Sequence, residues 1–287
     1  MSDIRLSIII VSWNVAVDLQ KCLDSIYKYI FLDYEIIVVD NNSHDDTVNI
    51  LQKEYPEVRV IANKVNMGFA AANNEAINIA KGEYLLILNP DTYFIDEHSI
   101  PVAIEYLQEH ENTLLTGNVL NEDRSNQVAV RKFPTLYSQI ITLLKLNNLL
   151  PFLNRVYYLR DFDYNTIQAV DSVIGAFMLI KSSTMRQMNS FDKEYFIWFE
   201  EVDLCYRLSE KNYAVMYFPQ AKIVHTGGQS FKQMFTLKKQ LIFNKSLLLF
   251  FRKYKPKWQY NILYILQPLN LLLAIIQQTF KIKKSDY

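Results

Sequence analysis

The first 118 residues of the chain alternate between short apolar segments and longer segments with helical periodicity. Five short runs rich in β-branched residues are typical of buried strands: 6–11, 35–39, 58–61, 84–88 and 113–116. Between them, apolar residues recur at three- and four-residue steps over 19–30, and a second helical segment covers 69–80, ahead of Gly82. This alternation predicts an α/β fold in which helices cover both faces of a mostly parallel, Rossmann-like sheet.

The rest of the chain changes character twice. Residues 132–165 carry few charges and no clear strand, which predicts a helical, apolar insertion. After it, 173–180, 213–218 and 222–225 are expected strands, and 200–211 is an expected helix. From residue 231 onward the sequence is helical and apolar, interrupted by Pro256 and Pro268. We therefore predict one large domain over 1–230 and a C-terminal helical region over 231–287.

Composition narrows the functional class. The chain has 30 basic and 30 acidic residues, and its formal net charge of zero argues against a nucleic-acid-binding protein, which usually has a basic excess. Cys22 and Cys205 form neither a disulfide framework nor a metal-site spacing, so a reducing compartment is expected. The apolar run 8–11 is followed by polar residues and suits a first strand better than a signal peptide. We expect a cytoplasmic protein.

Polar residues follow three of the expected strands, at the point where each strand ends. They are Ser12, Trp13 and Asn14 after the first strand, Asp40 and Asn41 after the second, and Asn89 and Asp91 after the fourth. In α/β folds, ligands bind at the carboxyl ends of the strands. Turn and cap residues are of the same types, so each cluster alone also has a purely structural interpretation. The three clusters together indicate one polar crevice.

Three segments have the chemistry of a nucleotide site. The Asp40 carboxylate can accept a hydrogen bond from a pyrimidine N–H, although it can also cap a helix that begins near Asp45. Asp91 offers one carboxylate at the sheet edge, which is enough for Mg²⁺ when a diphosphate supplies further oxygens. The segment from Asn66 through Gly68 to Asn73 contains three alanines, so a helix there can begin close to a diphosphate or pack tightly on a neighbour.

Later motifs add acid–base and ligating groups. Glu200, Glu201 and Asp203 lie at the start of an expected helix, behind a run of aromatic residues. Carboxylates walled by aromatic side chains can have raised pKa values and act as general bases, whereas a solvated helix N-terminus is the alternative interpretation. His225 precedes a Gly pair at a strand end, where it can ligate a metal, bind phosphate or be structural. Gly175 and Ala176 are small enough for a strand that passes under a bound sugar.

The order of these motifs resembles glycosyltransferase family 2, nearest to its rhamnosyltransferase-like branch. The matching segments are 12–14, 39–43, 66–68, 89–92, 175–177, 199–204 and 225–228, within residues 5–230. The order of the whole set is highly specific, although the single motifs are not. The resemblance implies a GT-A fold, a nucleotide-diphospho-sugar donor, a divalent metal (Mg²⁺ or Mn²⁺) and inversion at the anomeric carbon.

The resemblance also implies roles for individual residues. Asp40 would contact the pyrimidine, Asp91 would bind the metal, and His225 would lie near the metal or the diphosphate. Glu201 would be the general base, although the family usually has Glu-Asp where this chain has Glu200-Glu201. Asp203 belongs to the same acidic motif. The remaining candidates for donor binding are Ser12, Trp13, Asn14, Asn41, Asn66, Gly68, Asn73, Asn89, Gly175 and Ala176.

We therefore predict an inverting glycosyltransferase of cell-surface polysaccharide synthesis that moves a hexose to an acceptor hydroxyl. Rhamnose from dTDP-rhamnose is the first expectation, and UDP-linked hexoses stay open. A nucleotidyltransferase would need a Gly- and Arg-rich loop after the first strand, which residues 12–14 lack. A non-catalytic nucleotide-sugar-binding or scaffold protein is the other class, and donor hydrolysis with and without metal separates it from an enzyme.

The C-terminal region raises a separate question. Residues 260–280 are apolar but broken by polar residues and Pro268, so a transmembrane helix is not expected. Basic residues flank this segment: Arg252, Lys253, Lys255 and Lys257 before it, and Lys281, Lys283 and Lys284 after it. Such flanks suit peripheral contact with the inner face of an anionic membrane, where a lipid-linked glycan acceptor would lie. Packing on the domain or in a homodimer is the alternative.

Overall fold

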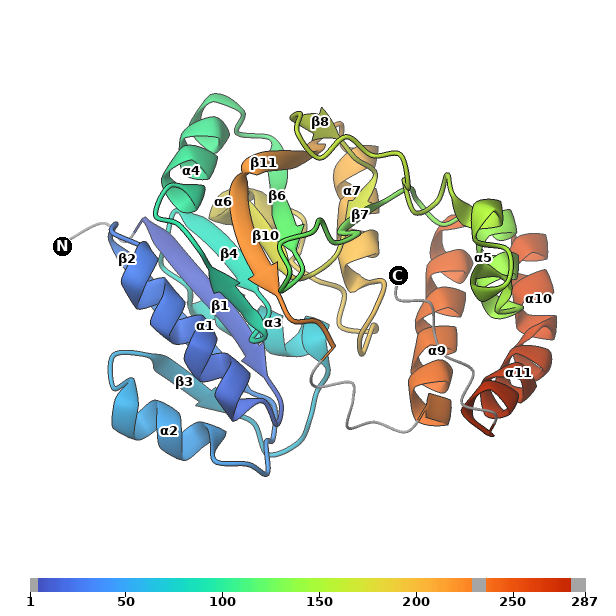
Figure 1. Cartoon of the computed structure of the whole chain (residues 1–287), viewed down its shortest axis with the longest axis horizontal. Coiled ribbons are helices and arrows are strands. Elements are labelled where there is room, and N and C mark those ends of the chain that lie inside the picture. The colour runs from blue at the N-terminus through green and yellow to red at the C-terminus, as the bar shows by residue number, and fades with distance from the viewer. Residues whose placement is uncertain (1–4, 229–235, 280–287) are drawn as a thin grey trace.

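The computed structural model describes residues 5–228 and 236–279, and its centre is a twisted sheet (Figure 1). Four parallel strands form one half of this sheet: β3 (Arg59–Ala62), β2 (Tyr34–Asp40), β1 (Leu6–Ser12) and β4 (Tyr84–Leu88), in that spatial order. The other half continues with β10 (Phe177–Lys181), β6 (Thr113–Leu120), β11 (Ala214–His225) and β5 (Thr92–Phe94). In it, β10 runs antiparallel to β4 and β6, and β5 runs antiparallel to β11.

Helices cover both faces of the sheet, as the sequence predicts. On one face lie α1 (Ala16–Tyr29), α2 (Thr47–Glu54) and α4 (Ser99–Glu109), which share a buried apolar cluster with Ile8 and Ile10 of β1. On the other face lie α3 (Phe69–Ile79), α6 (Ser182–Gln187) and α7 (Glu200–Glu210), which share a second cluster with Ile9. Successive side chains of a strand point to opposite faces of the sheet. Ile8 and Ile10 of β1 therefore pack against the first layer of helices, and Ile9 packs against the second.

Two strand predictions need correction. The expected strand over 173–180 is divided in two, because β9 (Ser172–Val173) pairs with β7 (Val130–Arg131) in a separate small sheet before β10 begins. The two expected strands at 213–218 and 222–225 are one strand, β11, whose register shifts between Phe218 and Lys222. In β11, Met216 and Tyr217 also pair with β8 (Gln168–Ala169).

The C-terminal helices pack against the 132–165 segment (Figure 1). These helices are α9 (Thr236–Tyr254), α10 (Lys257–Ile265) and α11 (Gln267–Thr279), and the segment supplies α5 (Leu136–Leu143) and two short 3₁₀ turns, Leu146–Asn148 and Pro151–Asn154. The buried Asn270 side chain donates to Leu143 O at 2.7 Å and accepts from Asn244 at 2.9 Å, which holds α11 on α5 and α9. The expected domain boundary at 230/231, as well as Lys281, Lys283 and Lys284, lies outside the described residues.

A large apolar surface remains exposed on the last two helices. Its residues are Trp258, Ile262, Tyr264, Ile265, Leu269, Leu272, Ile275 and Ile276. No membrane span is expected from the sequence, yet by length and composition alone the stretch Lys257–Gln277 is long and apolar enough to cross a bilayer. A turn at Leu266 divides that stretch, and the Asn270 contacts tie it to α5 and α9.

Candidate active site

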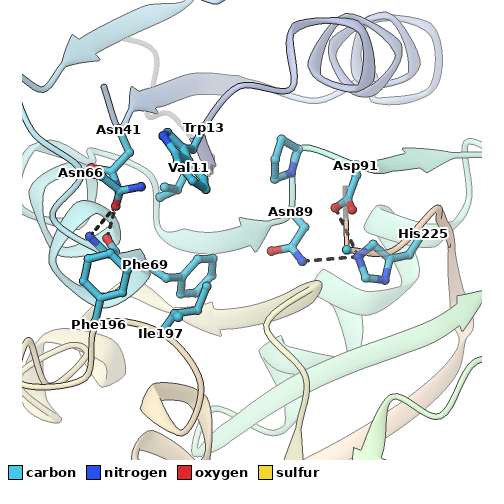
Figure 2. A pocket seen from close by; sticks show the side chains of 13 residues that line it. Val11, Trp13, Asn41, Asn66, Phe69, Asn89, Asp91, Phe196, Ile197 and His225 are labelled. Carbon is cyan, nitrogen blue, oxygen red and sulfur yellow. Dashed lines mark hydrogen bonds and ion pairs between the residues drawn. The ribbon is translucent and has the colours of Figure 1, made fainter. Parts of the chain in front are cut away.

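A pocket opens where β1, β2 and β4 end, as expected for an α/β sheet (Figure 2). Seven of the residues proposed from the sequence line it: Trp13, Asn41, Asn66, Gly68, Asn89, Asp91 and His225. Its opposite wall is formed by Phe196 and Ile197, from the loop that precedes α7. The three strand-end clusters therefore do meet in one crevice.

Asp91 and His225 are brought together by strand pairing. Thr92 of β5 pairs with His225 of β11, and Thr226 N donates to Asp91 O at 2.9 Å. This places His225 Nε2 3.2 Å from Asp91 Oδ1, with both side chains nearly buried (Figure 2). The short strand β5, which runs antiparallel to β11, thus brings two residues that are distant in the sequence into contact as one polar pair.

The His225 ring is oriented by Gln127. Gln127 Nε2 donates to Asn121 Oδ1 at 3.0 Å, so the Gln127 amide oxygen faces the ring and accepts from Nδ1–H at 2.7 Å. Nε2 then faces the pocket, where Asn89 Nδ2 lies 3.4 Å away (Figure 2). A ring nitrogen and a carboxylate oxygen that converge in this way can ligate a divalent cation.

The pair fits a cation that takes few ligands from protein. Within residues 5–228 and 236–279, no group of three or more His, Cys, Asp or Glu side chains could hold a metal ion. A cation held by Asp91 and His225 would therefore complete its coordination with oxygens from a bound diphosphate and water, as Mg²⁺ commonly does.

Asn41 and Asn66 shape the opposite end of the pocket. The Asn41 amide donates to Asn66 Oδ1 at 3.0 Å and to Gly68 O at 3.2 Å, and it accepts from Met67 N at 3.0 Å. Asn66 Oδ1 also accepts from Gly68 N at 2.9 Å. Both side chains line the pocket, but these bonds show that they also hold the loop that leads into α3.

Gly68 is required by its backbone conformation and by a close neighbour. Its φ is +85° and ψ is 173°, a region open almost only to glycine. A Cβ at this position would lie 2.2 Å from Phe196 O, and the next residue, Phe69, donates its N–H to that same oxygen at 2.7 Å. The loop that carries Phe196 therefore rests directly on the start of α3.

We expect Gly68→Ala to lower the free energy of unfolding by about 1–3 kcal/mol or more, because alanine would be strained in this backbone conformation and its Cβ would also clash with Phe196. Chemical denaturation measures the change. Gly228→Ala is the matched control: Gly228 also lines the pocket at positive φ, but no atom of the described residues lies within 4 Å of the point that its Cβ would occupy. Equal losses in both variants would show that contact with Phe196 contributes nothing.

Several other residues proposed for donor binding lie beside the pocket rather than on its surface. Asp40 is 2% exposed; its Oδ2 accepts from Ser43 N at 3.0 Å, while Oδ1 has no hydrogen-bond partner among the described residues. The buried oxygens Ser12 Oγ and Asn73 Oδ1 are also without such a partner there. Asp40 Oδ1 therefore has unused capacity to accept a hydrogen bond, although it is buried and does not line the pocket.

The remaining donor-binding candidates have structural contacts. Asn14 accepts from His44 N at 2.6 Å and donates its own N–H to Ser43 Oγ at 2.9 Å, which joins the loops after β1 and β2. Ala176 is fully buried, and its carbonyl accepts from Asn89 N at 3.2 Å. Gly175 faces the Phe69 ring, which would lie 3.3 Å from an added Cβ.

The acidic cluster at the start of α7 is buried and does not line this pocket. Asp203 is bound in a separate network, where it accepts from Arg207 Nε and from the Tyr254 hydroxyl, each at 2.7 Å. By contrast, Glu200 Oε2 and Glu201 Oε2 are buried without a hydrogen-bond partner among the described residues. The loop formed by Phe196 and Ile197 links this carboxylate pair to the pocket wall.

The two glutamates differ in electrostatic environment. Burial raises the pKa of both carboxyls, and repulsion from Glu201 raises the pKa of Glu200 further. The positive charge of Arg131 opposes this rise in the pKa of Glu201. Glu200 has no such nearby cation among the causes of its shift, and a positive charge favours the ionised form that a general base requires.

Gln127, Phe196 and Arg131 have functional positions that the sequence analysis does not identify. Gln127 lies in a turn-rich segment outside any motif, and its contact with His225 depends on chain folding. Phe196 belongs to the aromatic run before the acidic motif, which is the available sequence signal for a pocket wall. Arg131 ends a two-residue strand, which carries no distinctive pattern.

Comparison with known proteins identifies the family. A family model described as Glycosyl transferase family 2 matches residues 7–184, which contain most of the pocket. The chain belongs to glycosyltransferase family 2. The resemblance inferred from the motif order is therefore confirmed, and the chain is a glycosyltransferase.

Relatives in family 2 include rhamnosyltransferases. Rhamnosyltransferase WbbL of Escherichia coli K12 is 27% identical over 212 residues, which are 71% of this chain and 76% of the relative. The N-acetylglucosaminyl-diphospho-decaprenol L-rhamnosyltransferase of Mycobacterium tuberculosis is 23% identical over 247 residues, 80% of this chain and 78% of the relative. These similarities agree with a rhamnosyltransferase-like branch.

Solved structures of other glycosyltransferases share the fold. The mannosyltransferase PcManGT from Pyrobaculum calidifontis, in complex with GDP-Man and Mn²⁺, superposes with a TM-score of 0.58 at 17% identity, over 95% of this chain and 73% of that one. GalNAc-T7 with UDP, GalNAc and Mn²⁺ gives a TM-score of 0.59 at 17% identity, over 78% of this chain and 44% of that one. The predicted GT-A fold is thus confirmed.

Proposed function

We propose that the protein transfers rhamnose from dTDP-rhamnose to a hydroxyl of a cell-surface glycan acceptor, with inversion at the anomeric carbon. The single observation that carries this proposal is the Asp91–His225 pair, which faces a pocket at the carboxyl ends of the parallel strands. The rhamnosyltransferases among the relatives support the choice of sugar. The pair suits the diphosphate of a nucleotide sugar, and the pocket beyond it suits the nucleoside.

The nucleoside would lie between Trp13 and Asp40. The unpartnered Asp40 Oδ1 can accept the ring N–H of thymine, and the half-buried Trp13 offers an aromatic face for stacking. The loop held by Asn41 and Asn66 closes this side of the site. Asp40 thus would distinguish a pyrimidine that donates a hydrogen bond from one that does not.

Asp91 and His225 would hold a divalent cation, Mg²⁺ or Mn²⁺, against the donor diphosphate. Bound there, the cation supplies positive charge that stabilises the departing diphosphate. Glu201 takes the proton from the acceptor hydroxyl while the acceptor oxygen bonds to the anomeric carbon. The bond between that carbon and the diphosphate oxygen breaks, and dTDP leaves with its electron pair.

A donor screen tests this function. Hydrolysis of dTDP-rhamnose, UDP-glucose, UDP-N-acetylglucosamine and GDP-mannose is measured with Mg²⁺, with Mn²⁺ and with EDTA. Metal-dependent hydrolysis of dTDP-rhamnose alone is the expected result. Metal-dependent hydrolysis of another donor would change the sugar assignment, and binding without turnover of any donor would indicate a non-catalytic protein.

The charge of Arg131 leads to a prediction about pH. Since Glu201 must be ionised to act as base, kcat should rise with pH through the pKa of this residue, which burial has already raised. Removing the nearby positive charge raises that pKa further. Arg131→Gln should therefore move the acidic limb of the kcat–pH profile to higher pH.

Lys132→Gln is the matched control for this prediction, since Lys132 is the neighbouring cation but pairs with Asp171 at 3.2 Å. Its acidic limb should coincide with that of the parent protein. If the acidic limb of the kcat–pH profile does not move in Arg131→Gln, the residue whose ionisation controls kcat is not Glu201.

We also propose that residues 1–230 carry out the donor chemistry at the cytoplasmic face of a membrane, while 231–287 contact the lipid. The exposed apolar surface of α10 and α11 supports this view, together with the exposed cations Arg252, Lys253 and Lys257 beside it. A lipid-linked acceptor would bring the protein to that surface.

Ile265→Asn with Leu272→Asn should reduce co-sedimentation with phosphatidylglycerol vesicles by roughly tenfold or more, since burying each apolar side chain is worth about 1.5–3 kcal/mol. Ile265 and Leu272 are 74% and 53% exposed, so the fold should be retained. Val17→Asn is the matched control, because Val17 is 78% exposed on α1. The surface would instead be a homodimer interface if the double variant sediments with vesicles like the parent, and if the parent is a dimer while the variant is a monomer.

A further inference from the structure

A second pocket lies on the other side of the loop that forms the wall of the active site. It is a partly open pocket lined by residues of this loop, of α9 and of α10, and its volume is about 590 Å³. Pockets that bind small molecules usually measure ~300–1,000 Å³. The second pocket is therefore large enough for a ligand group of its own.

The lining of this pocket is rich in positive charge. It contains Lys193, Lys245 and Arg252 against a single carboxylate, that of Glu194. Arg252 and Glu194 approach to 3.5 Å, but both are more than half exposed, and such pairs contribute little stability. Neither lysine forms an ion pair with any residue in the described part of the chain. The excess of cations favours an anionic ligand.

The floor and the surroundings of the pocket are apolar. Leu248 and Leu249 of α9 lie between the two cations of that helix, and Tyr260 of α10 completes the lining. Tyr260 belongs to the same helix as the exposed Trp258 and Ile265. A ligand anchored by the cations can therefore extend an apolar chain over the exposed surface of α10 and α11.

The second pocket is close to the active site along the chain and in space. Lys193 and Glu194 line the second pocket, while Phe196 and Ile197 line the first, and consecutive Cα atoms are about 3.8 Å apart. Ser246, which follows Lys245, donates its hydroxyl to Ile197 O at 2.9 Å. Lys245 is thus the chain neighbour of a residue that is hydrogen-bonded to the wall of the active site.

We infer that this second pocket binds the diphosphate of a lipid-linked acceptor, with Lys193, Lys245 and Arg252 as its ligands. The acceptor sugar attached to that diphosphate would pass the loop at 194–197 and present its hydroxyl to the donor. This inference rests on the proposed glycosyl transfer for its biological meaning, but the binding itself is a property of the second pocket alone. The ligand is an amphiphile that carries both charge and an apolar chain.

Farnesyl diphosphate is a suitable probe, and its binding is measured by calorimetry in EDTA, so that no metal bridges it to the donor site. We expect Lys245→Gln with Arg252→Gln to raise the Kd by roughly tenfold or more, as loss of charged hydrogen bonds does. Lys238→Gln with Lys211→Gln removes the same charge from exposed positions outside the pocket and should leave the Kd unchanged. Farnesol, which lacks the diphosphate, should bind much more weakly.

Three outcomes would overturn the inference. Equal weakening by both double variants would mean diffuse attraction of charge. A change of the Kd in either direction in Asp91→Ala would place the diphosphate in the donor site. No weakening by any variant would mean that the pocket does not bind the diphosphate. Failure of the proposed function is separate, because it appears as absence of metal-dependent donor hydrolysis. With an active enzyme, the pocket variants should raise the KM for N-acetylglucosaminyl-diphospho-decaprenol, while the control pair keeps the parent value.

Discussion

Asp91→Ala is expected to abolish metal-dependent sugar transfer, with a loss of roughly 10³-fold or more in kcat/KM. Asp91 is the carboxylate that faces His225 across 3.2 Å, and no third acidic or histidine ligand completes a metal group with them among the residues that the structure describes. Donor hydrolysis with a Mn²⁺ titration measures the loss. A second readout is Mn²⁺ binding in the presence of dTDP, which should also weaken.

The variant should remain folded, because the neighbouring strand pairing uses the backbone. Thr226 donates both its N–H and its hydroxyl to Asp91 O, and neither bond needs the carboxylate. A thermal melt close to that of the parent is the control. Normal turnover with Mn²⁺ in a folded Asp91→Ala variant would contradict the assignment of the metal site.

Glu201→Gln should lower kcat by ~10²–10⁴-fold, the usual contribution of a general base, while donor binding is retained. Glutamine keeps the shape of the side chain and cannot accept the proton. Single-turnover transfer to acceptor measures the chemical step, and dTDP-rhamnose titration measures binding. The loss of kcat should exceed any change in the Kd of the donor.

Glu200→Gln and Asp203→Asn are the comparison variants. Asp203→Asn should mainly lower stability, since it weakens the bond from Arg207 within α7 and the bond from Tyr254 that joins α7 to α9. Glu200→Gln should have the smaller effect on kcat, because Glu200 lacks the nearby charge of Arg131 that favours the ionised form of Glu201. A severe loss in Glu200→Gln with a mild effect in Glu201→Gln would exchange the roles of the two residues.

The early part of the fold is predictable because its strands are buried on both faces. Such strands leave continuous apolar runs in the sequence, and β1, β2 and β4 are found where those runs occur. The register shift in β11 and the separation of β9 from β10 are not visible in this way, because a bulge and a change of sheet depend on neighbours that the local sequence does not specify.

The site shows the same division. Strand-end motifs identify Asp91 and His225 separately, but the contact between them depends on the pairing of β5 with β11. Gln127, which orients His225, has no motif. Asn41 and Asn66 have the residue types of ligand-binding groups, yet much of their hydrogen-bonding capacity is used within the loop before α3. A motif therefore predicts well where a side chain lies. Whether its hydrogen bonds hold the protein together or remain for a ligand can be seen only in the folded structure.

The position of β11 has a consequence for how the protein is made. It is the last strand among the residues that the structure describes, yet it lies between β6 and β5 and provides the partner for both. Ribosomes add ~5–20 residues per second, so synthesis from β6 to β11 takes on the order of ten seconds. During that interval the nascent chain has unpaired strand edges, which are templates for aggregation, and His225 has not yet joined Asp91. The proposed cation site therefore cannot assist early folding, because the nascent protein must close its sheet before Asp91 and His225 meet.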